Sequence, residues 1–191
     1  MSDQDEQTLD IRKPHGIRIE AKPTPLTQGR MVYTHLRAYR FYKHNNAWAK
    51  AGPVLIPVRY LVWVIEGLIG LEDTMKATPL PETLPPRFEI DPYRDIHEKS
   101  DLGVKCTVKR KNDGTPYFWA HLYNHNDEGD VAALSLFEGH VPHLIEGLLE
   151  ARNQMEASNS ELANSRPQST LEAAQSRIVE YERALGRKYR P

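Results

Sequence analysis

The sequence predicts an α+β fold in which two β-β-β-β-α repeats pack as a pseudo-symmetric intramolecular dimer, followed by a C-terminal helix. An internal repeat is the first sign of it: residues 42–68 and 123–148 both begin Tyr-x-His-Asn and both end Ile-Glu-Gly-Leu. Strand-like alternation precedes each of these stretches, and a run with helical spacing closes each of them. A duplicated unit of this length indicates two copies of one small fold.

The strands are expected where apolar and polar residues alternate, because a strand with one buried face has a period of two. The longer strands are also rich in aromatic and β-branched residues, which favour extended structure. The expected strands are 9–11, 17–22, 31–43 and 49–57 in the first repeat, and 88–90, 104–109, 116–124 and 131–137 in the second.

Helices are expected at the end of each repeat and at the end of the chain. The run at 58–71 is apolar nearly all round, which is typical of a helix buried on more than one side, as at an interface between two copies. The run at 140–152 has a single apolar face. The third helix begins with a capping box, Ser169-x-x-Glu172. It is amphipathic, so it docks on its own domain or supports a homodimer.

These patterns divide the chain into five parts. A linker is expected at 77–87 because four prolines fall within nine residues, and another at 153–168 because that stretch is polar and mobile in composition. The expected parts are the first repeat at 8–76, the proline-rich linker at 77–87, the second repeat at 88–152, the mobile linker at 153–168, and the C-terminal helix with its basic tail at 169–191.

Composition excludes several classes of protein. The 25 Lys and Arg residues are balanced by 26 Asp and Glu residues, which argues against a histone-like protein with a wholly basic surface. A hydrophobic content of 39% is too high for a disordered chain. Apolar runs are far shorter than the ~20 residues that cross a bilayer, and the N-terminus lacks the order of a signal peptide. We therefore expect a cytoplasmic protein with no membrane partner.

The positive charge is concentrated in the first repeat. Residues 8–68 hold ten Lys or Arg against three Asp or Glu, a net charge of +7, whereas residues 103–148 hold four against six, a net charge of −2. A cluster of cations on one surface favours a polyanionic partner, although a merely solvated basic face has the same composition.

Two runs in the first repeat resemble a known family. Residues 32–39 (VYTHLRAY) and 48–57 (WAKAGPVLIP), with the helix that follows, are similar to the positive cofactor four family of single-stranded-DNA-binding transcriptional coactivators. The Whirly and Pur-alpha proteins share the same β-β-β-β-α unit, in Pur-alpha as tandem repeats. The resemblance covers residues 8–73 and, more weakly, 88–152. It implies a pair of curved sheets that hold single-stranded DNA or RNA.

Carried over residue by residue, the resemblance implies contacts from Arg30 in the loop, Arg37 on the strand and Lys50 in the basic turn. Arg40 stands where the family has an aromatic residue, so Phe41 or Tyr42 substitutes for it. In the second repeat only Lys111 and His121 match, and an acidic turn at 127–130 replaces a basic one. That departure puts binding by the second repeat in doubt.

The residues alone indicate a similar surface. Alternate residues of the 31–43 strand combine aromatic rings with cations, which suits the π faces of unpaired bases and their phosphates. Alternatively these aromatic residues belong to the core, and the two repeats bury the same face only if a bulge intervenes. The complete set of candidate binding residues is Arg30, Tyr33, Arg37, Tyr39, Arg40, Phe41, Lys43, Lys50, Lys111 and His121.

Catalytic motifs are not found in the sequence, so we expect no catalytic residue and no cofactor. Asp10 with Glu20-x-Lys22 faintly resembles a metal-dependent nuclease, and His140 with His143 lies one helical turn apart, but ordinary surface residues explain both better, and no metal is expected. The prediction is a non-catalytic single-stranded nucleic-acid-binding protein that acts with the transcription, replication or repair machinery. The alternative is an interaction module that docks on a polymerase or nuclease and binds no nucleic acid.

Overall fold

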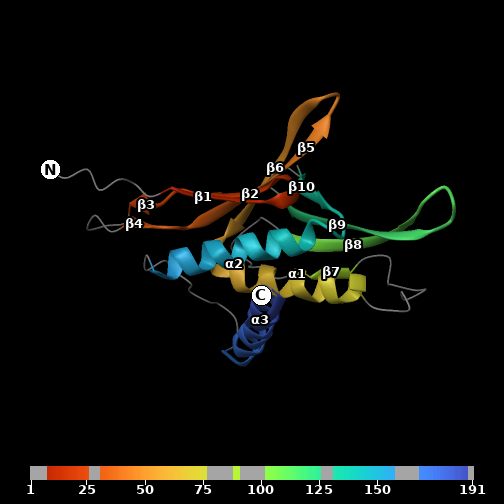
Figure 1. Cartoon of the computed structure of the whole chain (residues 1–191). Coiled ribbons are helices and arrows are strands. Elements are labelled where there is room, and N and C mark those ends of the chain that lie inside the picture. The colour runs from red at the N-terminus through yellow and green to blue at the C-terminus, as the bar shows by residue number, and fades with distance from the viewer. Residues whose placement is uncertain are drawn as a thin grey trace.

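The computed structural model describes residues 8–25, 31–76, 88–90, 102–125, 131–157 and 168–188. Within these residues the fold is α+β, with two four-stranded antiparallel sheets and three α-helices, the last of them toward the C-terminus (Figure 1). The first sheet runs in the order β1 (Leu9–Lys13), β2 (Ile17–Ala21), β5 (His35–His44) and β6 (Ala47–Pro57). The second runs β10 (Val131–Leu136), β9 (Pro116–His125), β8 (Leu102–Arg110) and β7 (Phe88–Ile90).

The remaining elements are short pieces and helices. Two short strands, β3 (Thr24–Pro25) and β4 (Met31–Val32), pair with each other beside the first sheet. The helices are α1 (Leu61–Lys76), α2 (Val141–Ala157) and α3 (Gln168–Lys188), and single 3₁₀ turns cover Pro14–Gly16 and Val58–Tyr60. Within the described part of the chain, none of the helices combines the length and apolar character needed to cross a membrane.

Strand alternation produces the buried face of the first sheet as the sequence predicts. Ile17 and Ile19 of β2 are buried, whereas Arg18 and Glu20 between them are partly exposed on the opposite face. Leu36 and Ala38 continue the buried face on β5. One core joins both sheets and all three helices, so the apolar faces of the two halves form a single interior.

Each of the first two helices packs on the sheet of the other half of the chain. Helix α2 lies against β1 and β2 of the first sheet, while α1 contacts β8 of the second sheet and also α2 (Figure 1). Gly147 makes this close approach possible, because a Cβ atom there would lie only 2.7 Å from Cδ1 of Ile19. Helix α1 is buried nearly all round, because it packs against β8, α2 and α3.

A bulge separates the two parts of the β5–β6 hairpin. Ala38 pairs with Val54 and Arg40 pairs with Ala51, so Gly52 and Pro53 of β6 together oppose the single residue Tyr39. Gly52 has φ +95°, a conformation that residues with a side chain rarely adopt. Beyond the bulge the hairpin stands away from the body of the molecule (Figure 1).

The two halves do not bury equivalent positions under the Tyr-x-His-Asn alignment. The first half buries Leu36 and Ala38, whereas the second buries Ala120 and Leu122, which align with Tyr39 and Phe41. The positions that point into the core are therefore shifted by one residue between β5 and β9. From the sequence, a bulge is the condition for both repeats to bury the same face; a bulge is present, but it lies on β6 and leaves the alternation within β5 unchanged.

Helix α2 extends beyond the expected boundary of the second repeat. It continues to Ala157, so residues 153–157, which the sequence assigns to a mobile linker, are helical. The reason is the buried side chain of Met155, which continues the apolar face of Leu148 and Ala151 into the core. The proline-rich linker at 77–87 and residues 158–167 lie outside the described residues.

Helix α3 uses its apolar stripe within the chain. Ile178 is fully buried in the common core, and the Tyr181 hydroxyl donates a hydrogen bond to the buried carboxylate of Glu72 on α1 at 2.5 Å. Arg177 forms ion pairs with Glu66 at 2.5 Å and Asp73 at 3.0 Å. These contacts fit the expectation that α3 docks on its own domain, and a homodimer through this helix stays a prediction.

Replacing Ile65 with Asp tests the central position of α1. Ile65 is fully buried, so the carboxylate would be desolvated in an apolar interior, and we expect the variant to be unfolded at 25 °C. Urea denaturation followed by circular dichroism measures the change. Val179→Asp, on the exposed side of α3, is the control and should keep nearly the wild-type midpoint. A folded Ile65→Asp variant would contradict the packing described above.

Candidate nucleic-acid interface

The face of the first sheet turned away from the helices carries half of the predicted binding residues. The pairing register places side chains from all four strands on it, because cross-strand partners point to the same side of a sheet. We call this surface the outer face. Its members are Asp10, Arg12, Arg18, Glu20, His35, Arg37, Tyr39, Phe41, Lys43, Trp48, Lys50 and Leu55.

Positive charge exceeds negative charge on the outer face. Five of its residues are Lys or Arg and two are acidic, which gives a net charge of +3 with His35 neutral. The cations lie on β1, β2, β5 and β6, so they come from segments far apart in the sequence. Three of them, Arg37, Lys43 and Lys50, were predicted, and the sheet brings them together. Arg30 lies outside the described residues.

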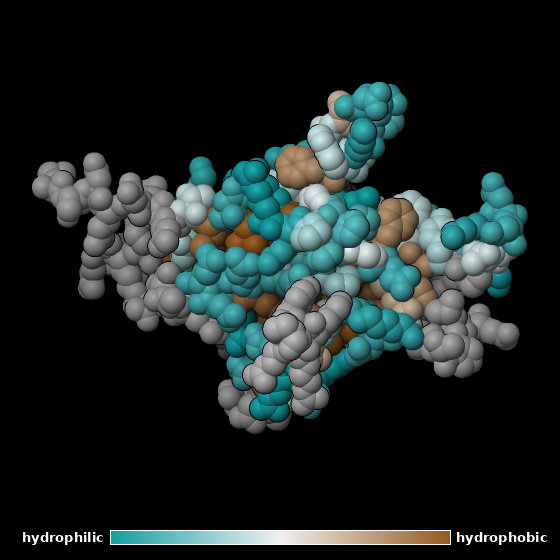
Figure 2. Space-filling view, viewed as in Figure 1, coloured by the Kyte–Doolittle hydropathy of each residue, from teal (hydrophilic) through white to brown (hydrophobic). Residues whose placement is uncertain are grey.

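The hairpin presents exposed aromatic rings next to these cations. Trp48 is 69% exposed. Phe41 is partly exposed, and it lies two residues before Lys43, the cross-strand partner of Trp48. Both rings line a recess of about 330 Å³ together with Arg12 and Arg18. In the view of Figure 2 hydrophilic residues predominate, and brown apolar groups appear near the hairpin that stands away from the body and in patches over the body itself.

Trp48 is the aromatic residue that the sequence analysis missed. Asn45 and Asn46 both have positive φ, as in the two-residue hairpin turn of type I′. That turn pairs His44 with Ala47 and Lys43 with Trp48, so the indole falls on the same face as Lys43. The Asn-Asn turn signal in the sequence is sufficient to derive this register.

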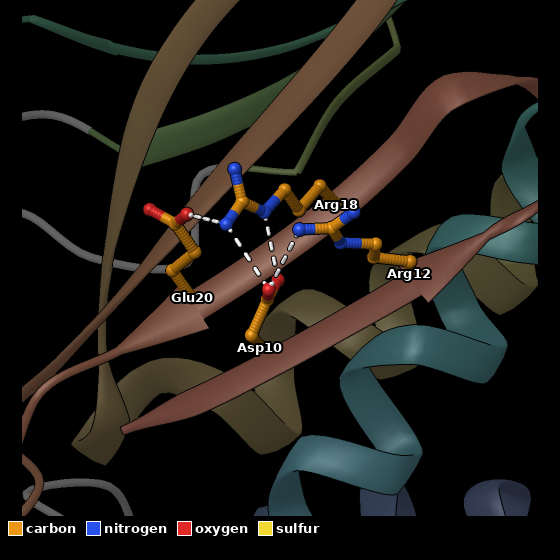
Figure 3. A network of polar contacts seen from close by, with 4 residues as sticks. All are labelled: Asp10, Arg12, Arg18 and Glu20. Carbon is orange, nitrogen blue, oxygen red and sulfur yellow. Dashed lines mark hydrogen bonds and ion pairs between the residues drawn. The ribbon is translucent and has the colours of Figure 1, made fainter.

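A network of ion pairs holds the arginines of the outer face in place (Figure 3). Arg18 donates from Nε to Asp10 at 2.7 Å and pairs through Nη2 with Glu20 at 2.6 Å. Arg12, which is 71% exposed, pairs with Asp10 at 3.0 Å. The hydrogen bonds from Arg18 and then Arg12 hold the pKa of Asp10 at about 2, so this carboxylate stays charged.

The same network includes Asp10 and Glu20, the two acids that give the sequence its faint resemblance to a metal-dependent nuclease. Asp10 and Glu20 are direct cross-strand partners, so their carboxylates do lie on one face, as the faint motif requires. The guanidinium of Arg18 occupies the space between them and already bonds to both. Among the described residues no group of three His, Cys, Asp or Glu side chains is placed to hold a metal ion. The pair of acids therefore positions an arginine.

Tyr39 is buried rather than available for stacking. It is only 4% exposed, and the Lys50 ammonium lies 4.1 Å from the centre of its ring. Burial, followed by a hydrogen bond to Glu20, raises the pKa of the Tyr39 hydroxyl. In this arrangement the ring supports Lys50 through a cation–π contact, and it meets a base only if Lys50 moves.

Two other predicted residues lie away from the outer face. Tyr33 is 4% exposed and belongs to the common core, because the chain between β4 and β5 turns its side chain inward. Arg40 follows Tyr39 on the strand and so points to the opposite face. There its guanidinium donates to the carbonyl oxygen of Ser135 at 2.6 Å and lies 5.4 Å from the centre of the Phe137 ring. Neither Tyr33 nor Arg40 therefore lies on the outer face, where the sequence placed them.

The second sheet carries an aromatic row of its own, which we call the Trp119 row. Trp119 stacks on His121 at 5.2 Å between ring centres and on Phe137 at 6.0 Å. The Lys109 ammonium lies 3.2 Å from the centre of the Trp119 ring. His121 was predicted as a binding residue, and the alternation of aromatic residues along β9 was the signal for Trp119, whereas Phe137 follows β10.

Lys111, the other predicted residue of the second half, lies in the turn between β8 and β9. The turn is closed by hydrogen bonds from the Lys111 amide to the Thr115 carbonyl and from the Gly114 amide to the Lys111 carbonyl, both at 2.9 Å. Its exposed side chain lines a groove of about 590 Å³ together with Arg110, Tyr117 and Phe137. The second half thus also combines cations with rings.

Three histidines meet where the β1–β2 turn packs on α2. The His15 ring lies 5.1 Å from the centre of His143 and 5.7 Å from that of His140. Nδ1 of His140 accepts the backbone amide of Phe137 at 3.0 Å, so the proton of the neutral ring is on Nε2. Burial, followed by the positive charge of Arg40 and by His15, lowers the pKa of His140 to about 4.

Comparison with known proteins adds no constraint on the interface. The chain matches no protein-family model, and no curated protein is similar enough to count as a relative. Function is therefore inferred from the arrangement of the side chains.

The His140 environment predicts loss of stability in acid. Its folded pKa lies below the ordinary value of about 6.5, so between pH 6.5 and 4 the unfolded chain binds a proton that the folded chain rejects. Stability should fall by about 2 kcal/mol through that window, and His140→Asn should remove that part of the fall. Urea unfolding at pH 7, 5.5 and 4.5 measures it. An unchanged profile in His140→Asn would refute the assignment.

Proposed function

We propose that this protein binds single-stranded nucleic acid on the outer face of its first sheet, without catalysis, as part of transcription, replication or repair. The observation that carries the proposal is the recess in which the Trp48 and Phe41 rings lie beside Arg12 and Arg18. An unpaired base offers a π face for stacking, and its neighbouring phosphates attract the cations. A duplex hides its base faces, so this combination favours single strands.

The outer face is long enough for a short single strand of nucleic acid. Residues 35–43 of β5 extend over roughly 27 Å at about 3.3 Å per residue, enough for a few nucleotides of extended chain. Cations lie along this length at Arg37, Lys50 and Lys43, with Arg18 and Arg12 beside them on β2 and β1. Their spread along the strand fits a backbone that carries one charge at every nucleotide.

The Trp119 row supports a second contact with the same ligand. Lys109, Arg110 and Lys111 follow one another along β8 and its turn, next to Trp119 and Phe137. Rings and cations are again interleaved, although the rings already stack on each other and Lys109 covers Trp119. We propose weaker binding here than on the outer face.

We also infer that the two halves are copies of one unit, as in the positive cofactor four, Whirly and Pur-alpha proteins that the sequence resembles. The inference is supported by matching order: each half has four antiparallel strands in one sheet followed by a helix. Because the buried positions are shifted by one residue, the Tyr-x-His-Asn motifs do not occupy equivalent places in the two copies. An interaction module on the same fold is the competing function, and the binding assays below separate the two.

The first test is a salt titration with single-stranded and duplex oligonucleotides of equal length. Binding of the single strand should be tighter and should weaken as salt rises, since counterions are released. Arg37→Ala should flatten the logarithmic salt dependence by about 0.7 if it removes one phosphate contact to a single strand. Lack of binding at low salt to either oligonucleotide would favour the interaction module.

Replacing Trp48 with Ala tests stacking separately from charge. Loss of one stacked base should weaken single-strand binding by about 1–3 kcal/mol with little change in the salt slope. Tyr42→Ala is a matched control, because Tyr42 is also exposed on the same hairpin but points to the opposite face. Equal losses from the two variants would contradict a site on the outer face. Thermal unfolding of both proteins checks that the loss is not one of stability.

A further inference from the structure

A second recess lies at the end of the outer face remote from the hairpin turn. It has a volume of about 560 Å³, and three threonines from three different segments, Thr8, Thr24 and Thr34, contribute to its lining. Lys22, His35 and Arg37 line it as well. Hydroxyl and cationic donors thus converge there from β1, β2, the β3–β4 pair and β5, whereas the recess at the hairpin end is lined mainly by rings and arginines.

The charge inside this recess is positive despite the presence of Glu20. Glu20 lines the recess, but it is already ion-paired with Arg18 at 2.6 Å. Lys22 and Arg37 therefore contribute two positive charges that this acid does not balance. Leu55 is the one large apolar side chain of the lining, and most of the lining residues can donate a hydrogen bond.

The imidazole of His35 is subject to the positive charges of two arginines. Its Nδ1 lies 3.1 Å from the Thr34 hydroxyl oxygen. Burial first, and then the charges of Arg59 and Arg37, lower the pKa of this ring. His35 therefore stays neutral at pH 7, and a nearby anion would reverse the effect of the two arginines and raise its pKa.

We propose that this recess binds the terminal phosphate monoester of the nucleic-acid strand that lies on the outer face. A phosphate monoester carries about −1.5 to −2 charges at pH 7 and has three acceptor oxygens, whereas a diester within the strand carries one charge. Two cations and several hydroxyl donors match the monoester better. The inference rests on the proposed function, and it adds that the protein recognises strand ends.

The position of the recess agrees with an end rather than with a continuing strand. Thr24 belongs to β3 of the small β3–β4 pair, and Thr34 to the connection between β4 and β5. Both segments border the outer face beyond the last row of the first sheet. A strand that follows β5 from the hairpin therefore meets this border at the recess.

The test uses three unlabelled thymidine hexanucleotides: one with a 5′-phosphate, one with a 3′-phosphate and one with neither. Quenching of Trp48 emission reports binding, in a Trp63→Phe, Trp119→Phe background that leaves Trp48 as the single indole. One of the two phosphorylated oligonucleotides should bind about tenfold more tightly than the unphosphorylated one. Inorganic phosphate, added at constant ionic strength, should abolish this gain and leave the binding of the unphosphorylated oligonucleotide unchanged.

Two variants test whether the gain from the terminal phosphate arises in the recess. Lys22→Met should abolish the gain from the terminal phosphate while leaving the unphosphorylated oligonucleotide nearly unaffected. Lys43→Met, at the hairpin end of the outer face, is the matched control and should weaken all three oligonucleotides equally. The pKa of His35, followed by NMR, should rise when the phosphorylated oligonucleotide is added, which a merely structural role of Lys22 would not produce.

The outcomes separate the two proposals. Equal affinity for all three oligonucleotides, with Trp48 quenched by each, overturns end recognition and leaves single-strand binding intact. A gain that survives Lys22→Met, or an unchanged His35 pKa, also overturns it, because the phosphate then binds elsewhere. Absence of quenching and of binding by any oligonucleotide at low salt overturns the proposed function itself.

Discussion

The packing of each helix on the sheet of the other half is the interaction on which the rest of the structure depends. Helix α2 reaches β2 because Gly147 has no side chain to hold it away from Ile19, and α1 contacts β8 and α2. Neither half can bury its apolar strand face with its own elements alone in this arrangement. The inner faces of both sheets are therefore covered from one side of the molecule, and the opposite faces are left to carry polar and aromatic residues.

The cations of the outer face repel one another, and the acids on the same face reduce this repulsion. Arg12, Arg18 and Arg37 lie within one sheet face, where like charges repel. Asp10 and Glu20 reduce this repulsion and fix Arg18 through three short contacts, so that the cations keep a defined position before any ligand arrives. A fixed guanidinium loses less conformational freedom on binding, which increases the affinity available from each phosphate contact. The near-neutral composition of the whole chain conceals this local positive surface.

Much of the fold follows from local sequence, and the parts of the site that do not follow depend on partners far away in the chain. Alternation predicts β2 and β5, and the apolar run predicts a buried α1. The inward turn of Tyr33 could not be derived, because it depends on where β4 ends and on the core beyond it. The burial of Tyr39 depends on Lys50 across the bulge, and the direction of Arg40 becomes meaningful only when β10 supplies Ser135. Trp48, in contrast, was derivable from the two-asparagine turn.

Arg40 links the two candidate surfaces. It lies between Tyr39 and Phe41 on β5, yet its side chain crosses to the second sheet, donates to Ser135 and covers Phe137. Phe137 in turn stacks on Trp119, so the aromatic row of the second half is in contact with the hairpin of the first. Strand β6 also packs against β10, and the Pro14–Gly16 turn packs against β5. The Arg40 contacts add to this packing, and together they restrain the direction of the hairpin relative to the arginines of β1 and β2.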